Sequence, residues 1–217
     1  FPYTTLFRSL KETDLSKLII AYSDHWAYNY ATEDVPFDQL HLLTQAAGQH
    51  WTNHGFKNGH RSEENVIPGF NTVVIDVDHG TTWESAKELL KDYKYLTYTT
   101  KRHTNQDHRF RILMPTNYEL KLDGKDYKEF MSNIYEWLPF IVDTQTNQRS
   151  RKWLSHNGHY EYNEGEVLDA LPFIPKTSKN EARKELLNSQ QSMDNLERWL
   201  LNQANEGGRN NTLLKFA

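Results

Sequence analysis

An apolar run that ends in two aspartates constrains the fold of this chain more than any other feature. Residues 71–75 read Asn-Thr-Val-Val-Ile and lead into Asp76 and Asp78. The β-branched residues predict a strand, and the period of two along a strand places both carboxylates on one face where it ends. Because neighbouring carboxylates repel unless a cation lies between them, the pattern predicts a site for Mg²⁺ or Mn²⁺. The alternative is an Asp-rich turn that closes the strand with the help of Gly80.

Length and composition allow one sizeable globular domain, or one domain with a small appendage. The chain has 217 residues, of which 37% are hydrophobic and 13% aromatic. Its formal charge of -4 argues against a protein that coats nucleic acid, but it allows a local basic groove beside an acidic site. The absence of cysteine excludes disulfides, thiolate nucleophiles and cysteine-based zinc sites. No apolar stretch approaches the roughly 20 residues of a membrane span, so we expect a cytoplasmic protein without a membrane partner.

The alternation of strand-like and helix-like segments between residues 71 and 155 predicts an α+β fold. We expect strands at residues 71–78, 95–100, 109–114, 140–142 and 152–155, with Pro115 closing the third, and helices at 83–92 and 125–138. This is the β-α-β-β-α-β order of the split βαβ, RNA-recognition-like arrangement, in which helices flank a mostly antiparallel sheet. Since such a fold hosts many functions, the function has to be argued from the site.

Before this unit we predict an N-terminal α/β extension. Residues 18–22 are apolar, and Asp34 is expected to cap a helix that runs to about Gln49. Residues 50–68 are expected to form a polar loop. Three histidines in this loop lack a fourth ligand, so we do not favour a zinc site: His50, His54 and His60.

We divide the chain into three parts. Residues 1–9 resemble a translated sequencing adapter, and we interpret them as an artefact. Residues 10–174 are expected to form the main domain. Residues 175–217 become polar and then show a capping pattern, which predicts a linker followed by C-terminal helices, the truncated start of a separate helical module.

Three acids and two arginines form a candidate catalytic set in the main domain. Asp143 follows the apolar run 140–142, so that with Asp76 and Asp78 it places three acids at strand ends. Such a set can hold two divalent ions for in-line attack on a phosphate. Arg109 and Arg111 lie two residues apart on one predicted strand, so both can bind a triphosphate from the same face. The plainer interpretations are a charged edge strand and an aspartate that caps a loop.

Other polar residues lie close to this set in the sequence. The hairpin before Arg109 carries Lys101 and His103, and His103 is placed to bind a phosphate oxygen or to protonate a leaving pyrophosphate. Five basic residues are expected to contact nucleic-acid phosphates: Lys57, Arg61, Arg149, Arg151 and Lys152.

Taken in order, these segments resemble the archaeo-eukaryotic primase superfamily, and within it the primase-polymerases of phages and mobile elements. The matching segments are Ile-Asp-Val-Asp at 75–78, Tyr-Thr-Thr-Lys-Arg-His at 98–103, His-Arg-Phe-Arg-Ile-Leu-Met-Pro at 108–115, Val-Asp at 142–143 and Gln-Arg-Ser-Arg-Lys-Trp at 148–153. The resemblance covers about residues 50–160, and residues 207–217 look like the opening of the helical domain that often follows.

The resemblance implies that residues 10–174 are a primase-polymerase catalytic domain on an RNA-recognition-like sheet. It implies a template-directed nucleotidyltransferase that joins nucleoside triphosphates during replication of a phage or mobile element, in the host cytoplasm. Asp76, Asp78 and Asp143 would be the ligands of a two-metal site for Mg²⁺ or Mn²⁺. The implied partners are a single-stranded DNA template, nucleoside triphosphates and a helicase or helical domain of the full-length protein.

One motif departs from the family pattern. The expected Ser-x-His strand motif is absent, and its place is taken by Arg109-Phe110-Arg111. Either His103 moves in from the hairpin or Arg111 replaces the histidine as triphosphate ligand. We favour the two residues acting together.

Two other functions fit part of the pattern. A metal-dependent nuclease of ribonuclease H type also uses clustered acids, but it leaves the two arginines without a role. A non-catalytic module that binds single-stranded nucleic acid would favour exposed aromatic residues on the central strands, where this sequence has carboxylates.

Overall fold

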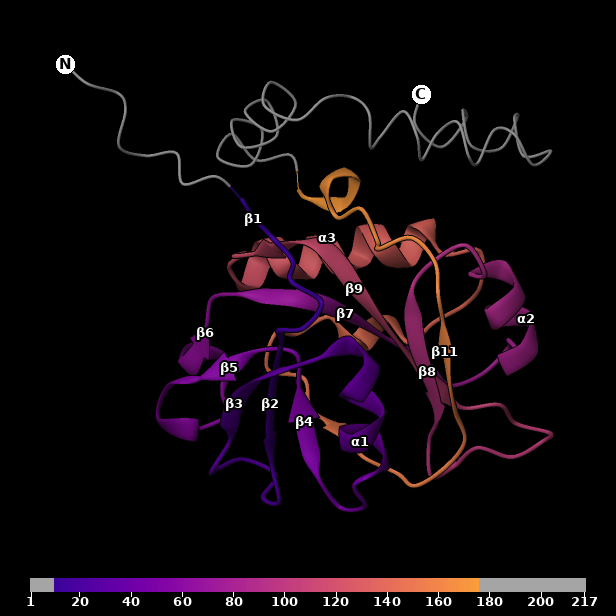
Figure 1. Cartoon of the computed structure of the whole chain (residues 1–217), viewed down its shortest axis with the longest axis horizontal. Coiled ribbons are helices and arrows are strands. Elements are labelled where there is room, and N and C mark those ends of the chain that lie inside the picture. Colours follow the sequence, from indigo (N-terminus) through magenta and orange to yellow (C-terminus); the bar gives the residue numbers. More distant parts are fainter. Residues whose placement is uncertain (1–9, 176–217) are drawn as a thin grey trace. The chain divides into compact units, whose positions relative to one another are not determined.

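Strand β9 (Phe110–Leu120) is the centre of the main sheet in the computed structural model, which describes residues 10–175 (Figure 1). It pairs with β7 (Phe70–Val77) on one side and with β8 (Tyr95–Thr99) on the other. β11 (Tyr160–Asn163) extends the sheet beyond β8, and the short β1 (Lys11–Glu12) pairs with the far end of β9. All these pairings are antiparallel, so β7 and β8 run parallel to each other with β9 between them.

Two helices connect and cover these strands. α2 (Trp83–Leu89) joins β7 to β8, and α3 (Gly124–Trp137) follows β9. Asp123 begins α3 as its N-cap, because its carboxylate accepts hydrogen bonds from the first free N–H groups of the helix. The β-α-β-β-α order and the α+β class agree with the prediction. None of the helices between residues 10 and 175 is both long enough and apolar enough to cross a membrane.

The predicted fourth strand of this unit is not formed. Residues 140–142 have no strand partner, and the Ile141 side chain is exposed. The segment still lies beside β7, since the N–H of Asp143 donates to the carbonyl of Asp76 at 2.9 Å. Two features explain why no strand forms here. Pro139, which lacks an N–H, precedes this short apolar run, and one hydrogen bond to β7 is not enough to form a strand. The other predicted strand, β10 (Trp153–Leu154), pairs with a second sheet instead.

That second sheet makes up most of the N-terminal region, where an α/β extension was expected. Its strand order is β10, β4 (His50–Thr52), β2 (Leu18–Ser23) and β3 (Ala31–Val35). A separate ribbon pairs β5 (Gly55–Phe56) with β6 (Val66–Ile67). The prediction of a polar loop over residues 50–68 was therefore wrong.

The helix expected from Asp34 to Gln49 is much shorter. Asp34 pairs with Ile19 of β2, and Pro36 rather than Asp34 precedes the helical part. That part consists of a 3-10 turn, η1 (Phe37–Gln39), and α1 (Leu40–Gln45). Residues 31–35 form a strand instead of a helix because all five pair antiparallel with β2, whose residues are mostly buried.

β9 also runs past the point where the sequence predicted its end. Pro115 pairs with Thr72, next to a register shift between Phe70 and Thr72. A proline is tolerated in a sheet at such an irregularity because the strand does not need its missing N–H there.

The core lies between the two sheets. Figure 1 shows α3 on one side of β7 and β9, with β2, β3 and β4 on the other. Large buried side chains from both sheets meet in one cluster: Leu18, Ile20, Trp51, Val74, Leu96, Tyr98, Leu113 and Trp153. The face of β7 that carries Val74 is thus the face that meets the second sheet.

A buried histidine makes the stability of this fold depend on pH. His54 packs between Phe70 and Tyr127, and burial lowers its pKa to about 3 from the usual 6.5. Its ring bonds only Asn53 among the described contacts, at 3.1 Å, and so stays neutral in the folded protein.

We predict that His54 makes the free energy of unfolding fall as the pH drops from about 6.5 toward 3. In this window the unfolded state binds a proton that the folded state excludes, so the slope approaches ~1.4 kcal/mol per pH unit. Urea unfolding of the parent and of His54→Phe measures this, and the variant loses that part of the slope. Parallel pH curves for the two proteins would show that His54 does not carry the effect.

Candidate metal centre

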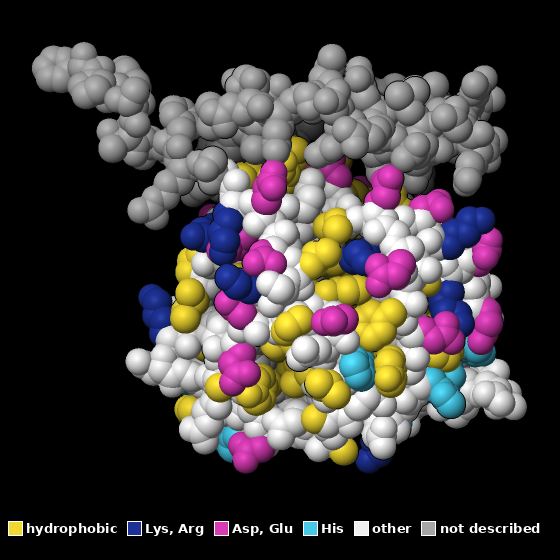
Figure 2. All heavy atoms as spheres, in the orientation of Figure 1, with side chains coloured by type: hydrophobic (Ala, Val, Ile, Leu, Met, Phe, Trp, Pro, Cys, Tyr) yellow, Lys and Arg dark blue, Asp and Glu magenta, His cyan; other side chains and the backbone are white. Residues whose placement is uncertain are grey.

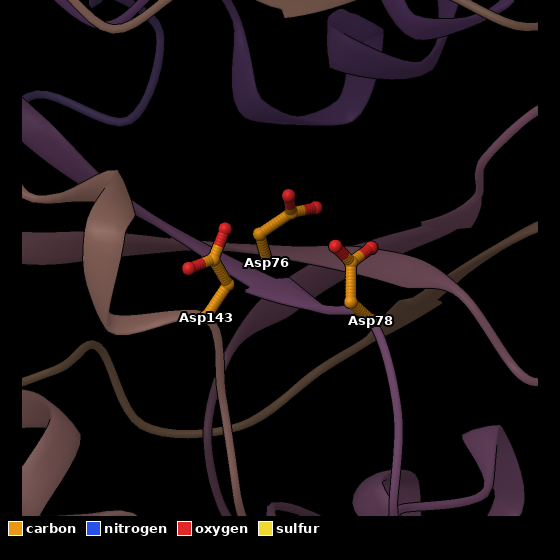
Figure 3. Close-up of side chains that lie close together, drawn as sticks. All are labelled: Asp76, Asp78 and Asp143. Atoms are coloured by element: carbon orange, nitrogen blue, oxygen red, sulfur yellow. The ribbon is translucent and has the colours of Figure 1, made fainter.

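Three aspartates meet at the end of β7, although one of them lies far along the sequence (Figure 3). Asp76 is in β7 and Asp78 directly follows it, so alternation along the strand places both on the face that carries Val74. Asp143 precedes a 3-10 turn, η4 (Thr144–Thr146), and its N–H bonds the carbonyl of Asp76. One carboxylate oxygen of each residue lies within 4.8 Å of the other two. We call these three residues the aspartate triad.

The three members of the triad differ in burial. The Asp76 side chain is only 6% exposed, whereas Asp78 and Asp143 are partly exposed. Burial raises the pKa of Asp76; Arg111 opposes this rise and Asp78 adds to it. The carboxylate of Asp143 is held in place because it accepts the N–H of Gln145 at 2.9 Å.

A buried ion pair fixes Asp76. The register sets Asp76 of β7 opposite Arg111 of β9, and Arg111 opposite Tyr98 of β8. Arg111 donates from Nε to Asp76 at 2.9 Å, and from a terminal nitrogen to the hydroxyl of Tyr98 at 3.0 Å and to the carbonyl of Leu154 at 3.1 Å. Its guanidinium also faces the Trp153 ring at 5.2 Å. Arg111 therefore uses Nε and one terminal nitrogen inside the protein, and its bond to the Leu154 carbonyl places β10 beside the triad.

Arg109 is the more available of the two arginines. A terminal nitrogen lies 3.8 Å from the carboxylate of Asp78, and Nε donates to Asp107 at 2.8 Å. A second terminal nitrogen contacts His79 at 3.2 Å. Because its partners are exposed side chains, Arg109 can exchange them for the oxygens of a phosphate.

His103 and Lys101 lie in the β8–β9 hairpin. The His103 ring packs against Trp83 and His108, and its Nδ1 accepts the N–H of Arg109 at 3.1 Å. Burial, together with His108, lowers the pKa of His103. Lys101 is exposed at the turn. No described contact joins either residue to the triad, so their roles stay predictions.

The five basic residues expected to bind nucleic acid have different surroundings. Arg149 is tied to Glu63 at 2.7 Å, and Lys57 is exposed. Arg61 donates to two backbone carbonyls, those of Trp26 and Ser150, each at 2.8 Å. The remaining two lie beside aromatic rings: Lys152 is 3.3 Å from His50, and Arg151 is over the Trp153 ring at 5.5 Å.

Sequence reasoning missed the residues that hold the charged groups in place. Tyr98 and Trp153 surround Arg111, and Glu63 binds Arg149. The contact of Tyr98 with Arg111 could have been predicted, because the register of β8 and β9 places these two residues opposite each other. Glu63 carried no signal, since its contact depends on how a distant loop folds back.

The donor set fits a hard divalent cation. Three carboxylates supply oxygen ligands only, and the mutual repulsion of their charges is relieved when a cation lies among them. Within the described residues this is the one cluster of three or more metal-ligating side chains. The histidines at 50, 54 and 60 have separate surroundings: His50 lies beside Lys152, His54 is buried, and His60 stacks on Tyr28.

The fold is similar to that of the AEP domain (PP-N190) of the cyanophage S-2L primase-polymerase (PrimPol). The TM-score is 0.41 and the sequence identity 11%, over 75% of this chain and 91% of that chain. No family model and no curated protein sequence matches this chain. Function is therefore inferred from the residues of the site.

We predict that the triad binds Mn²⁺ and that Asp143→Asn weakens the binding at least about tenfold, since even outer partners of metal ligands are worth that much. Asparagine keeps the acceptor for the Gln145 N–H, so the variant removes a charge and leaves the turn intact. Calorimetric titration measures the affinity, with the exposed Asp38→Asn as control. Equal affinities for parent and Asp143→Asn would exclude Asp143 as a ligand.

We also predict strong coupling between Asp76 and Arg111. Arg111→Leu leaves a buried carboxylate without its partner and costs about 3–5 kcal/mol of unfolding free energy. The double variant Asp76→Asn/Arg111→Leu removes both charges and loses clearly less than the sum of the single variants. Urea unfolding of the four proteins measures the coupling. Additive losses would mean that the pair contributes nothing as a pair.

Proposed function

We propose that residues 10–175 form the catalytic domain of a template-directed nucleotidyltransferase, a DNA primase or primase-polymerase. The observation that carries the proposal is the aspartate triad, whose oxygens lie within 4.8 Å of one another beside the guanidinium of Arg109. Acids that hold cations, next to an arginine that can bind phosphates, form the arrangement that joining nucleoside triphosphates requires.

The proposed reaction makes one bond and breaks another. A 3′-hydroxyl oxygen attacks the α-phosphorus of a nucleoside triphosphate, the bond from that phosphorus to the β-phosphate oxygen breaks, and the hydroxyl proton passes to solvent. Divalent cations, Mg²⁺ or Mn²⁺, held by Asp76, Asp78 and Asp143 would supply the Lewis-acid chemistry for both oxygens.

The residues of the chain have distinct roles in this proposal. Arg109 exchanges its bond to Asp107 for the phosphates of the incoming nucleotide. Arg111 keeps Asp76 in position through Nε, and one terminal nitrogen bonds Tyr98 and Leu154. Its second terminal nitrogen, which has no acceptor among the described residues, is left to bind a phosphate oxygen of the nucleotide. His103 can offer only Nε2–H to the leaving pyrophosphate, since its Nδ1 already accepts a backbone N–H. Lys101 adds positive charge at the exposed end of the hairpin.

The partners follow from the same chemistry. The domain would act on a single-stranded DNA template and nucleoside triphosphates, and a helicase or helical domain in the full-length protein would supply or hold that template. Replication of a phage or mobile element is the setting that the sequence resemblance implies.

We predict that the protein, given a single-stranded template, labelled nucleoside triphosphates and Mn²⁺, forms labelled oligomers. Asp78→Asn and Asp143→Asn each reduce synthesis about 100-fold or more, the usual cost of losing a group that stabilises transition-state charge. Asp38→Asn, outside the site, keeps the parent rate.

Each other result has a definite meaning. Shortening of the template instead of synthesis would favour the nuclease, and retention of template without any reaction would favour the non-catalytic binding module. Synthesis at the parent rate by Asp143→Asn would refute the assignment of the triad.

A further inference from the structure

We propose that the loop after β2 carries a stacking platform for the bases of single-stranded nucleic acid. The platform consists of four rings that contact one another in a row, Trp26, His25, Tyr28 and His60, and we call it the aromatic row. The inference rests on the proposed function only in naming the bound strand as the template.

The aromatic row presents large rings to solvent. The side chains of Trp26 and Tyr28 are 59% and 51% exposed, unlike the core aromatic residues. His25 stacks on Trp26 with centroids 5.7 Å apart and lies 5.3 Å from Tyr28, which in turn stacks on His60 at 4.7 Å. Trp26 is thus the end of the row, and a further ring can stack on the face of Trp26 that does not contact His25. Every base has a π-face that can take it.

The loop that carries the row is held in shape by its own hydrogen bonds. The hydroxyl of Ser23 donates to the carbonyl of Tyr28 at 2.6 Å, and it accepts the N–H of His25 at 2.9 Å. Nδ1 of His25 accepts the N–H groups of Ala27 and Tyr28, both at 3.0 Å. Because the rings are fixed in advance, binding a base costs little ordering of the loop.

A second segment, which contains Gly59 and Arg61, also holds the loop in place. The N–H of Arg61 donates to the carbonyl of Ala27, and its guanidinium to that of Trp26, both at 2.8 Å. Gly59 adopts φ +63° and lies against Tyr30, where a Cβ would come within 3.0 Å of the Tyr30 carbonyl oxygen. A residue with a side chain would therefore be strained at this φ and would push against the Tyr30 backbone.

Positive charge continues from the aromatic row toward the triad. Burial, reinforced by Arg61, Arg151 and Arg111, lowers the pKa of Lys152, so these cations lie close enough to repel it. Of the four, only Arg111 has an ion pair with a carboxylate among the described residues, and the buried Nε of Arg151 has no hydrogen-bond partner there. Cations in excess of nearby carboxylates attract the phosphates of a polyanion.

Direct contacts connect these features into one path. Arg61 joins the aromatic row to the carbonyl of Ser150, and Lys152 follows two residues later. β10 comes next, and its Leu154 carbonyl accepts from Arg111, which binds Asp76 of the triad. A strand with bases on the aromatic row and phosphates along Arg61 and Lys152 would therefore run toward the triad. The occupant is single-stranded, because the bases of a duplex hide their faces in the stack.

The test measures binding of a labelled oligodeoxythymidylate by fluorescence anisotropy, without divalent metal or nucleotide. Trp26→Ala is expected to weaken binding at least about tenfold, or ~1.4 kcal/mol, whereas Trp26→Phe keeps most of the affinity. Tyr160→Ala is the control, because Tyr160 is also an exposed, stacked aromatic residue but lies on β11. Lys152→Gln is expected to reduce the salt dependence of binding by about one counterion, whereas Trp26→Ala leaves that dependence unchanged.

Four results would overturn the inference. Three of them are parent affinity in Trp26→Ala, equal loss in Trp26→Phe and Trp26→Ala, and binding of a duplex as tight as that of the single strand. The fourth is salt-independent binding of the oligonucleotide, which would show that its phosphates do not contact the cations. Because the assay needs no synthesis, it separates the two proposals. A protein that binds the strand through Trp26 but makes no oligomers would keep this inference and refute the proposed function.

Discussion

The ion pair between Asp76 and Arg111 is the interaction on which the rest of the site depends. It lies across β7 and β9 inside the sheet, and Arg111 also donates to Tyr98 on β8 and to the Leu154 carbonyl of β10. The guanidinium of this β9 residue therefore contacts two other strands of the main sheet and one strand of the second sheet. A buried pair of this kind adds little net stability, but it penalises any register that separates the partners. The pair thus holds an acid where a hydrophobic residue would be more favourable for folding.

The burial of Asp76 next to Asp78 and Asp143 is explained if the three carboxylates bind a cation. Burial and Asp78 both raise the pKa of Asp76, while Arg111 offsets only part of this. The backbone bond from Asp143 to Asp76 then adds the third carboxylate without any strand pairing. Basic and acidic side chains are interspersed with hydrophobic ones over the described part of the face drawn in Figure 2, and the net charge of the chain is -4. Attraction for a polyanion would have to be local, and we propose that the residues around Lys152 provide it.

The sequence was most informative where the hydrophobic period was long and the end signals were clear. β7, β8 and α3 appear close to their predicted bounds, since runs of apolar β-forming residues mark the strands and apolar residues at helical spacing mark the helix. The sequence-based prediction failed where buried polar residues have the hydropathy pattern of a loop. Thr52, Asn53 and His54 lie inside the protein because they bond one another and nearby carbonyls, a solution that hydropathy alone does not reveal. The partners of Arg111 depended on strand register, and the aromatic row on a loop closed by Arg61.

We propose that Asp76, Asp78 and Asp143 together hold a pair of divalent cations. Electron paramagnetic resonance of the protein with Mn²⁺ and a non-hydrolysable nucleoside triphosphate tests this most directly. We predict the spectrum of two exchange-coupled Mn²⁺ ions about 4 Å apart, and its loss in Asp143→Asn. A spectrum of uncoupled, fully hydrated Mn²⁺ in the parent protein would contradict the account.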